Sequence, residues 1–370
     1  MIYGGTISQE PNMIEKSLPI TVAPIEGECL KTLLMRSASV YGVSTERFIE
    51  HCFRTQGQGH RILTYGTIDT LTAQLDKSLI HTLSDALSIS PLTLRQLTIA
   101  GRFKSASSTL IACTGASKNP DTGQENSNHQ LRFGWCPLCL MEDRAEGEHH
   151  HLRPEWSLAF VTMCQTHKRP LIGRCQMCYH FVASPDYAIY KDQLALVCPH
   201  CFTPLDGRHG YDFVTNEDAH RWNDNDVVQA VWERLVQYER LFLRALKSRA
   251  GHAKSLDILL EFSALVDLLL RSQIPDRYRS ADLFASPYLP SPTRLGLATR
   301  HLDHPFHICQ LVERRKAMAI IICMLEDANE MFRLDPCFPP MQLIREHLDK
   351  PTYNQFERHI LNITRYALPN

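Results

Sequence analysis

Apolar residues recur at helical spacing in several parts of the chain, and polar stretches separate these parts. Near the N-terminus, one face of a predicted helix carries an apolar stripe formed by Leu30, Leu33, Leu34, Ala38 and Tyr41. Gly42 can end this helix, and Ser44 can cap a second helix that contains Phe48 and Ile49. The pattern predicts a helix-turn-helix.

A second helix-turn-helix is predicted further along the chain. Its first helix covers about 79–87, a turn follows at 88–89, and Ser90 then stands as N-cap before Pro91 at the first helical position. As a DNA-reading unit, its second helix would present Thr93, Arg95 and Gln96 to a groove. The segment carries few basic residues, which favours a helical hairpin used for packing or for docking to a protein.

The remainder of the chain is a polar segment, a cysteine-rich segment and a helical half. Residues 104–130 are rich in Ser, Thr, Gly and Asn, which is typical of a linker. Beyond the cysteines, a Pro-rich break at 286–305 interrupts predicted helices at Val227–Arg249, Leu256–Arg271, Leu311–Arg333, Met341–Leu348 and Tyr353–Tyr366. We expect solvated helix faces to carry the basic residues Arg240, Arg244, Lys247, Arg249, Arg314, Arg315 and Lys316.

The predicted fold is therefore mainly α. We expect an N-terminal helix-turn-helix domain at 1–104, a linker at 105–130, a central tandem zinc-finger domain with short strands at 131–206, and a helical C-terminal domain at 207–370.

Tight cysteine pairs supply the clearest chemistry in the sequence. Four CxxC or CxxH pairs follow one another: Cys136 and Cys139, Cys164 and His167, Cys175 and Cys178, Cys198 and Cys201. An x₂ spacing lets two side chains from one turn reach the same Zn²⁺ at about 2.3 Å. A lone CxxC could be a redox dithiol or two buried thiols, but four pairs so close together favour metal.

Eight ligands make two closed tetrahedra, so we expect two structural Zn²⁺ ions per chain and no open position for an activated water. The pairs can combine as two consecutive sites or as an interleaved cross-brace. The loops between pairs are long enough for hairpins, which favours consecutive sites.

The residues around the pairs have simpler interpretations. His149, His150 and His151 are expected in a solvated loop, and His180 and His200 are expected to be bystanders of the ligands. A strand or short helix should give the metal domain its core through the apolar residues Trp156, Leu158, Phe160 and Val161. Lys168 and Arg169, beside the first zinc site, are candidate partner contacts.

Charge and composition limit the function classes. Lys and Arg number 39 against 40 Asp and Glu, so any nucleic-acid contact must be local or delivered by a partner. The chain shows no apolar run of about 20 residues and no basic-then-apolar leader, so we expect a cytoplasmic protein without a membrane segment. Because GxxxxGK, GxSxG and HExxH motifs are missing, no residues support an enzyme.

The order of motifs resembles the TniQ family of transposition proteins, which is related to TnsD. The matching strings are PIEGECLKTLLMRSA, WCPLCL, RPEWSLAFVTMCQTHKRPLIGRCQMC and CPHC, followed by a helical half. The opening GECLKTLLMRSA departs from the commoner acidic-Ser-Leu-aromatic form.

The resemblance implies a target-selection adaptor without catalytic activity. Such proteins connect a target-recognition event to the AAA+ ATPase TnsC, which brings the transposase. In CRISPR-associated transposons, TniQ binds the RNA-guided Cascade complex, often as a homodimer, whereas longer TnsD-like members read a DNA attachment site themselves. The competing hypotheses are a TnsD-like sequence-specific DNA-binding protein that uses the two helix-turn-helix patterns directly, and a metalloenzyme, which would need an open zinc position.

Overall fold

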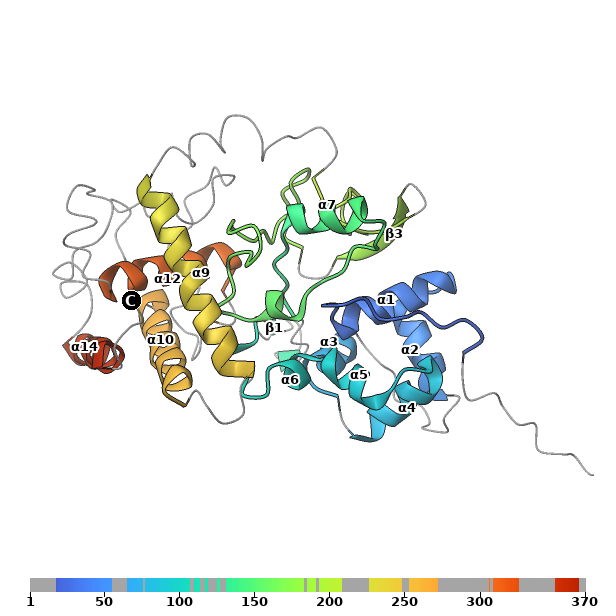
Figure 1. Ribbon diagram of the computed structural model, residues 1–370, viewed down its shortest axis with the longest axis horizontal. Helices are drawn as coiled ribbons and strands as arrows, with labels where there is room; N and C mark the ends of the chain where they lie inside the picture. The colour runs from blue at the N-terminus through green and yellow to red at the C-terminus, as the bar shows by residue number, and fades with distance from the viewer. Residues whose placement is uncertain are drawn as a thin grey trace, which may run out of the picture.

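The computed structural model is mainly helical, as the apolar pattern predicts (Figure 1). It describes residues 18–54, 65–75, 77–106, 110–113, 117–118, 125–126, 131–182, 185–190, 193–207, 226–247, 253–271, 306, 309–325 and 350–365. The cysteine-rich segment (green) lies between the N-terminal helices (blue) and the C-terminal helices (yellow to red).

Among the described residues, the N-terminal part has six helices: α1 (Leu30–Val40), α2 (Thr45–Arg54), α3 (Tyr65–Ala73), α4 (Lys77–Leu87), α5 (Pro91–Gln96) and α6 (Ile99–Arg102). Their apolar faces share one core, which includes Leu33, Leu34, Phe48, Leu83 and Leu94. Both predicted helix pairs are present, while α3 and α6 were not foreseen.

The turns between the paired helices use the residues that the sequence indicated. Gly42 takes a φ of 65° at the end of α1, and Ser44 Oγ accepts a hydrogen bond from the Arg47 amide at 3.4 Å. Ser88 takes a φ of 54° after α4, and Ser90 Oγ accepts from the Thr93 amide at 3.1 Å. Local chemistry therefore fixes where these helices end and begin.

Buried ion pairs fix the start of α1. Glu28 receives Arg36 Nε and Nη2, each at 2.7 Å. Lys31 is bonded to Asp69 Oδ1, and Asp69 Oδ2 accepts from the Leu131 amide at 2.9 Å. Asp69 thus joins α1 and α3 to the beginning of the cysteine-rich segment.

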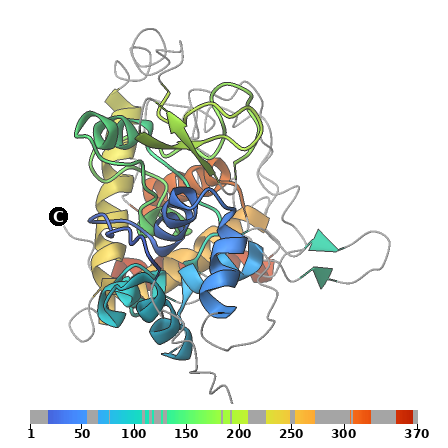
Figure 2. The ribbon, with the colours of Figure 1, turned by 90° about the vertical axis from the view of Figure 1, so that its right-hand side faces the viewer.

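The cysteine-rich segment contains little regular structure. It has α7 (Pro137–Ala145), the 3₁₀ helix η2 (Pro154–Ser157), and an antiparallel hairpin of β3 (Asp186–Tyr190) and β4 (Gln193–Val197), which pairs Asp186 with Val197. Figure 2, seen from the side of the N-terminal helices, shows α1 close beneath this hairpin. A second pair of strands, β1 (Ser117–Lys118) and β2 (Glu125–Asn126), is shorter.

Part of the segment that the composition assigns to a linker packs in the core. Leu110 and Ala112 are buried, Ile111 bridges Leu158, and the Ala112 amide donates to the Ser157 carbonyl at 2.7 Å. Residues 110–113 thus pair with the backbone of the cysteine-rich segment. The domain boundaries stay a prediction.

In the C-terminal part, the structure describes α9 (Asp226–Lys247), α10 (Ala253–Arg271), α12 (Leu311–Leu325) and α14 (Lys350–Arg365). These agree with four predicted helices, whereas the end of the predicted Leu311–Arg333 helix, the predicted Met341–Leu348 helix, Arg249 and the 286–305 break lie outside the described residues. None of the described helices has the length and hydrophobicity needed to cross a bilayer.

The prediction of solvated basic faces holds for α9 and is wrong for α12. Arg240, Arg244 and Lys247 are exposed, but Arg314, Arg315 and Lys316 are buried. Helix α12 is surrounded by protein, and its guanidinium groups donate to backbone carbonyls there. Arg314 Nη1 donates to the Ala159 carbonyl at 2.6 Å, and Arg315 Nε donates to the Thr162 carbonyl at 3.2 Å.

Candidate metal centres

The eight candidate ligands gather into two groups. Within each group, the ligand atoms all lie within 4.8 Å of one another. We call Cys136, Cys139, Cys164 and His167 the first centre, and Cys175, Cys178, Cys198 and Cys201 the second centre. The grouping is that of two consecutive sites and not of an interleaved cross-brace.

Three of the four ligand pairs sit on the same kind of turn, which we call a knuckle. In each knuckle the cysteine carbonyl accepts from the amide four residues on, and the cysteine amide donates to the carbonyl five residues on. The residue four positions after the first cysteine has a positive φ. These residues are Lys168 at 52°, Tyr179 at 58° and Phe202 at 55°.

The first pair, Cys136 and Cys139, uses a helix start in place of a knuckle. Cys136 is the N-cap of α7, Pro137 occupies the first helical position, and Cys139 lies in the first turn. Proline suits this position because its fixed φ is helical and its missing N–H costs nothing there. The positive end of the helix dipole favours thiolates at both cysteines.

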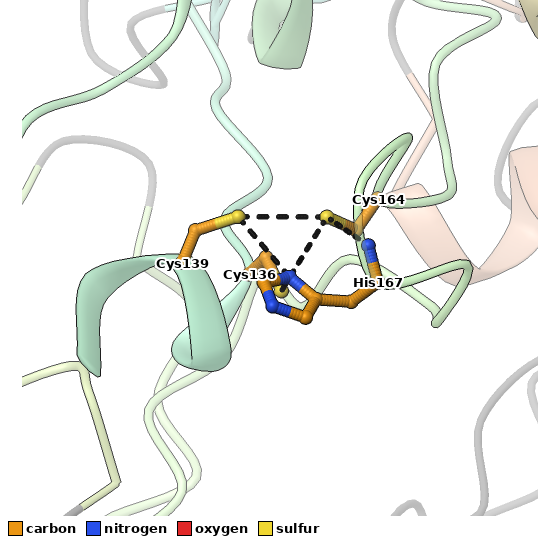
Figure 3. A group of neighbouring side chains, drawn as sticks. All are labelled: Cys136, Cys139, Cys164 and His167. Carbon is orange, nitrogen blue, oxygen red and sulfur yellow. Dashed lines mark hydrogen bonds between the residues drawn. The ribbon is translucent and has the colours of Figure 1, made fainter. Parts of the chain in front are cut away.

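The first centre has the dimensions of a tetrahedral zinc site (Figure 3). The His167 Nδ1 atom lies 3.5 Å from Cys136 Sγ, 3.4 Å from Cys139 Sγ and 3.5 Å from Cys164 Sγ. A tetrahedron with Zn–S near 2.3 Å and Zn–N near 2.0 Å has S···N edges of about 3.5 Å. The three thiols and one imidazole therefore fit Zn²⁺.

A carboxylate orients the imidazole of the first centre. His167 Nε2 lies 2.9 Å from Glu142 Oε1 on α7. With Nδ1 facing the thiols, Nε2 carries the proton, and this N–H donates a hydrogen bond to the Glu142 carboxylate. Carboxylate–histidine pairs of this kind fix the tautomer and the ring orientation of metal ligands.

The second centre has four sulfur atoms at similar spacing. Cys175 Sγ lies 3.5 Å from Cys201 Sγ, and Cys178 Sγ lies 3.7 Å from Cys198 Sγ. The S···S edge of a Zn(Cys)₄ tetrahedron is about 3.8 Å. Cys178 and Cys201 are half-buried, so this centre lies nearer the surface than the first.

Crowding of the thiols perturbs their acidity in opposite directions. The pKa of Cys164 is lowered, first by its hydrogen bond to Cys136 and then by that to Cys139, while the same kind of contact with Cys136 raises the pKa of Cys139. At Cys201, burial raises the pKa, but hydrogen bonds with Thr203 and the neighbouring thiols outweigh it and lower the pKa to about 6. Three or four thiolates this close would repel one another, and a divalent ion bound between them would offset that repulsion.

The histidines near the centres behave in two ways. His180 and His200 are exposed and stack on each other with ring centroids 4.6 Å apart, and neither belongs to a ligand group among the described residues. The expected solvated loop at 149–151 is wrong, because His150 and His151 are buried.

The 149–151 loop packs under the β3–β4 hairpin. His150 Nδ1 accepts from the Leu196 amide at 3.2 Å, and Tyr187 donates to the His150 carbonyl. Burial lowers the pKa of His151 to about 4, so its ring is neutral at pH 7.

The candidate partner residues lie on two separate elements. Arg95 and Gln96 are exposed on α5, where Thr93 is part of the N-terminal cap. Lys168 is exposed at the left-handed position of the first knuckle, and the half-buried Arg169 supplies the carbonyl that receives the Cys164 amide at 2.7 Å. The set on α5 and the set beside the first centre therefore belong to different parts of the fold.

Sequence reasoning missed the support that the C-terminal helices give to the first centre. Glu239 on α9 is fully buried and accepts from the Thr162 amide at 2.7 Å, the Thr162 hydroxyl at 2.8 Å and Gln165 Nε2 at 2.7 Å. Arg315 holds the carbonyls of Thr162 and Leu171 in the same loop. The available signal was an acidic residue on the apolar stripe of α9, between Tyr238 and Phe242.

Comparison with known proteins identifies a family for part of the chain. Residues 19–171 match the TniQ family, and no curated protein matched the chain. The matched segment contains α1 to α7 and every ligand of the first centre, and it ends before the second centre. The match supports a role in target selection for transposition.

Proposed function

From the premise that this chain carries the TniQ family region at residues 19–171, we propose that it is a non-catalytic adaptor of transposition. It links a target-bound Cascade complex to the AAA+ ATPase TnsC, and through TnsC to the transposase. The observation that carries the proposal is the family match, because it covers the N-terminal helices and the first centre together.

The ligand sets support an adaptor over a metalloenzyme. Each centre offers four protein ligands from cysteine and histidine, which is the donor set of structural zinc. We therefore propose two Zn²⁺ ions per chain that hold shape and do not take part in bond chemistry. Elemental analysis should give two zinc ions, and one zinc or any iron would contradict this assignment.

Charge supports docking to proteins. With 39 basic and 40 acidic residues, the chain has no general attraction for a phosphate backbone. Contacts with a Cascade complex and with an ATPase require only local complementarity. We place these contacts in the cytoplasm, where transposition acts on DNA.

We also propose that the protein acts as a homodimer. The motivation is the family resemblance together with N-terminal helices that expose apolar side chains, among them Val40 and Leu92. Light scattering at micromolar concentration tests this proposal, and a monomer would contradict it.

The adaptor role is tested by reconstituted transposition with every component except this one. We expect targeted insertion to stop while guide-RNA-directed DNA binding by the Cascade complex continues. Normal targeted insertion without the protein would refute the adaptor. Loss of target binding would instead assign it a role in recognition.

The alternative is a TnsD-like protein that reads DNA itself. It is favoured by the exposure of Arg95 and Gln96 on α5, which follows a capped turn. A direct reader binds its duplex at nanomolar concentration, with affinity that falls steeply as salt rises. An adaptor binds duplex DNA weakly, so a salt titration separates the two.

A further inference from the structure

A cleft of about 220 Å³ lies between the N-terminal helices and the second centre. The α1–α2 pair forms one wall, and the β3–β4 hairpin with the last knuckle forms the other. Its apolar lining includes Met35, Val43, Ile68, Val197 and Phe202. The family match, which ends at residue 171, covers only the first of these walls.

Two carboxylates that line this cleft form no ion pair with a described residue. Glu46 and Asp186 both line it, and no hydrogen bond or ion pair joins either carboxylate group to another described residue. The Oε1 atom of Glu46 is buried and unsatisfied. Among the described residues of the lining, the basic one is Lys31, which is already bonded to Asp69.

The pKa of Asp186 reflects the excess of negative charge in the cleft lining. Burial raises its pKa, and the nearby charge of Glu46 raises it further, against an opposing effect of Lys31. Two close carboxylates in a partly desolvated cleft repel each other, and a cation placed between them would relieve that repulsion.

Phe202, which also lines the cleft, is a second feature that favours a cationic ligand. It occupies the left-handed position of the last knuckle, with φ 55°, where Gly or Asn is less strained. Its side chain is 69% exposed, so the ring gains little from packing within the chain. An exposed aromatic face beside two carboxylates is suited to a guanidinium group, which stacks on rings and pairs with carboxylates.

We propose that this cleft binds a segment of a partner protein that presents an arginine flanked by apolar residues. The guanidinium pairs with Glu46 and Asp186 and stacks on Phe202, while the flanking side chains contact Met35, Val43 and Ile68. Nucleic acid is a poor occupant, because the two carboxylates repel phosphate. The inference deepens the adaptor role proposed above, since it names the chemistry of one docking partner.

The test uses two fluorescein-labelled capped peptides. One has the sequence Ala-Leu-Arg-Leu-Ala, and in the other citrulline, which has the same shape but no charge, replaces the arginine. Fluorescence anisotropy with the full chain should show saturable binding of the arginine peptide below about 1 mM. The citrulline peptide should bind about tenfold more weakly. No saturable binding of the arginine peptide, or equal binding of the two, would overturn the proposal.

Variants locate the binding on the chain. The double substitution Glu46→Gln with Asp186→Asn should weaken arginine-peptide binding about tenfold or more, and Glu357→Gln, an exposed acidic residue of α14, is the charge control. Phe202→Gly should also weaken binding. Its matched control is Tyr179→Gly, at the same left-handed position of another knuckle and outside the cleft lining.

Zinc content and unfolding temperature, measured on every variant, separate a lost contact from a lost fold. If the neutralised variants unfold, the charge-swap variant Glu46→Lys is tested with a peptide that has glutamate in place of arginine. Stronger binding of this glutamate peptide to the variant than to the wild type supports the proposed binding site, and unchanged binding opposes it. A fluorescein-labelled DNA duplex whose affinity depends on Phe202 would identify nucleic acid as the occupant and overturn the proposal.

Failure here is distinguishable from failure of the adaptor role. Peptide binding is measured on the purified chain and involves no insertion reaction. If peptide binding fails while reconstituted insertion still requires the chain, the cleft assignment is wrong and the adaptor role stands.

Discussion

The first and second centres each gather four ligands, three cysteines with one histidine in the first and four cysteines in the second, but their surroundings differ. In the first centre all three cysteines are buried, one pair starts a helix, and the loop of the other pair is held by Glu239 and Arg315 from the C-terminal helices. In the second centre two knuckles face each other, and Cys178 and Cys201 are half-buried. The comparison teaches that the first centre organises the core, while the second shapes a surface.

Removing one ligand from each centre should give the largest difference. Cys164→Ser should lose the first metal and the cooperative fold together, because structural zinc contributes folding free energy on the order of 10 kcal/mol. Cys178→Ser should lose the second metal and leave the core folded. Zinc analysis with thermal unfolding checks this, and equal loss of cooperative unfolding in both variants would remove the distinction between the centres.

Breaking the support from α12 should have the next largest effect. Arg315→Met leaves the buried Thr162 and Leu171 carbonyls without their donor, at a cost of about 1–3 kcal/mol in the free energy of unfolding for each unsatisfied carbonyl. Arg240→Met on exposed α9 surface is the control and should change that free energy by less than about 1 kcal/mol. Urea denaturation measures both, and equal effects would contradict the burial-based account.

Glu239 should make stability depend on pH. Burial raises its pKa from 4.5 to about 8, against hydrogen bonds from Thr162 and Met163 and the charge of Arg315. Between these two values the folded chain holds a proton that the unfolded chain releases. Stability from this group is therefore greatest below pH 4.5 and is lost as the pH rises towards 8, by at most about 1.4 kcal/mol per pH unit.

The measurement is urea denaturation of wild type and Glu239→Gln at several pH values between 5 and 8. The variant cannot ionise at this position, so the difference in unfolding free energy between the two proteins should change across that range. A difference that stays constant with pH would show that Glu239 does not titrate there.

The smallest expected effect is a loss of metal affinity at the first centre when Glu142 is replaced. Glu142→Gln weakens the hydrogen bond that orients His167, and loss of such a partner typically lowers metal affinity 10- to 100-fold. Competition with a zinc chelator should show one of the two metals released more easily. Gln176→Glu, beside Cys175 in the second centre, serves as a control that should leave release from the first centre unchanged.

Sequence could predict what is local. The CxxC and CxxH spacing predicts which two ligands lie on one turn, and the helix starts at Ser44 and Ser90 follow from side chains that bond to amides three residues away. The apolar periodicity predicted most of the longer helices. In each case the residues that decide the structure lie within one or two turns of each other.

Long-range partners could not be predicted in the same way. Arg314 and Arg315 look like part of a charged helix face, and their burial depends on carbonyls of residues 158–171, far away in the sequence. The 149–151 loop is buried because the β3–β4 hairpin covers it, and residues 110–113 leave the expected linker to pair near Leu158. A single sequence does not show which distant groups will satisfy a buried charge.

The most direct test of the account is targeted insertion by a variant that lacks only the second centre. Cys201→Ser should retain one zinc ion and cooperative unfolding, and in the reconstituted system it should lose targeted insertion because the docking surface is no longer shaped. Insertion at the wild-type level by a variant shown to hold one zinc would contradict the claim that the second centre serves docking.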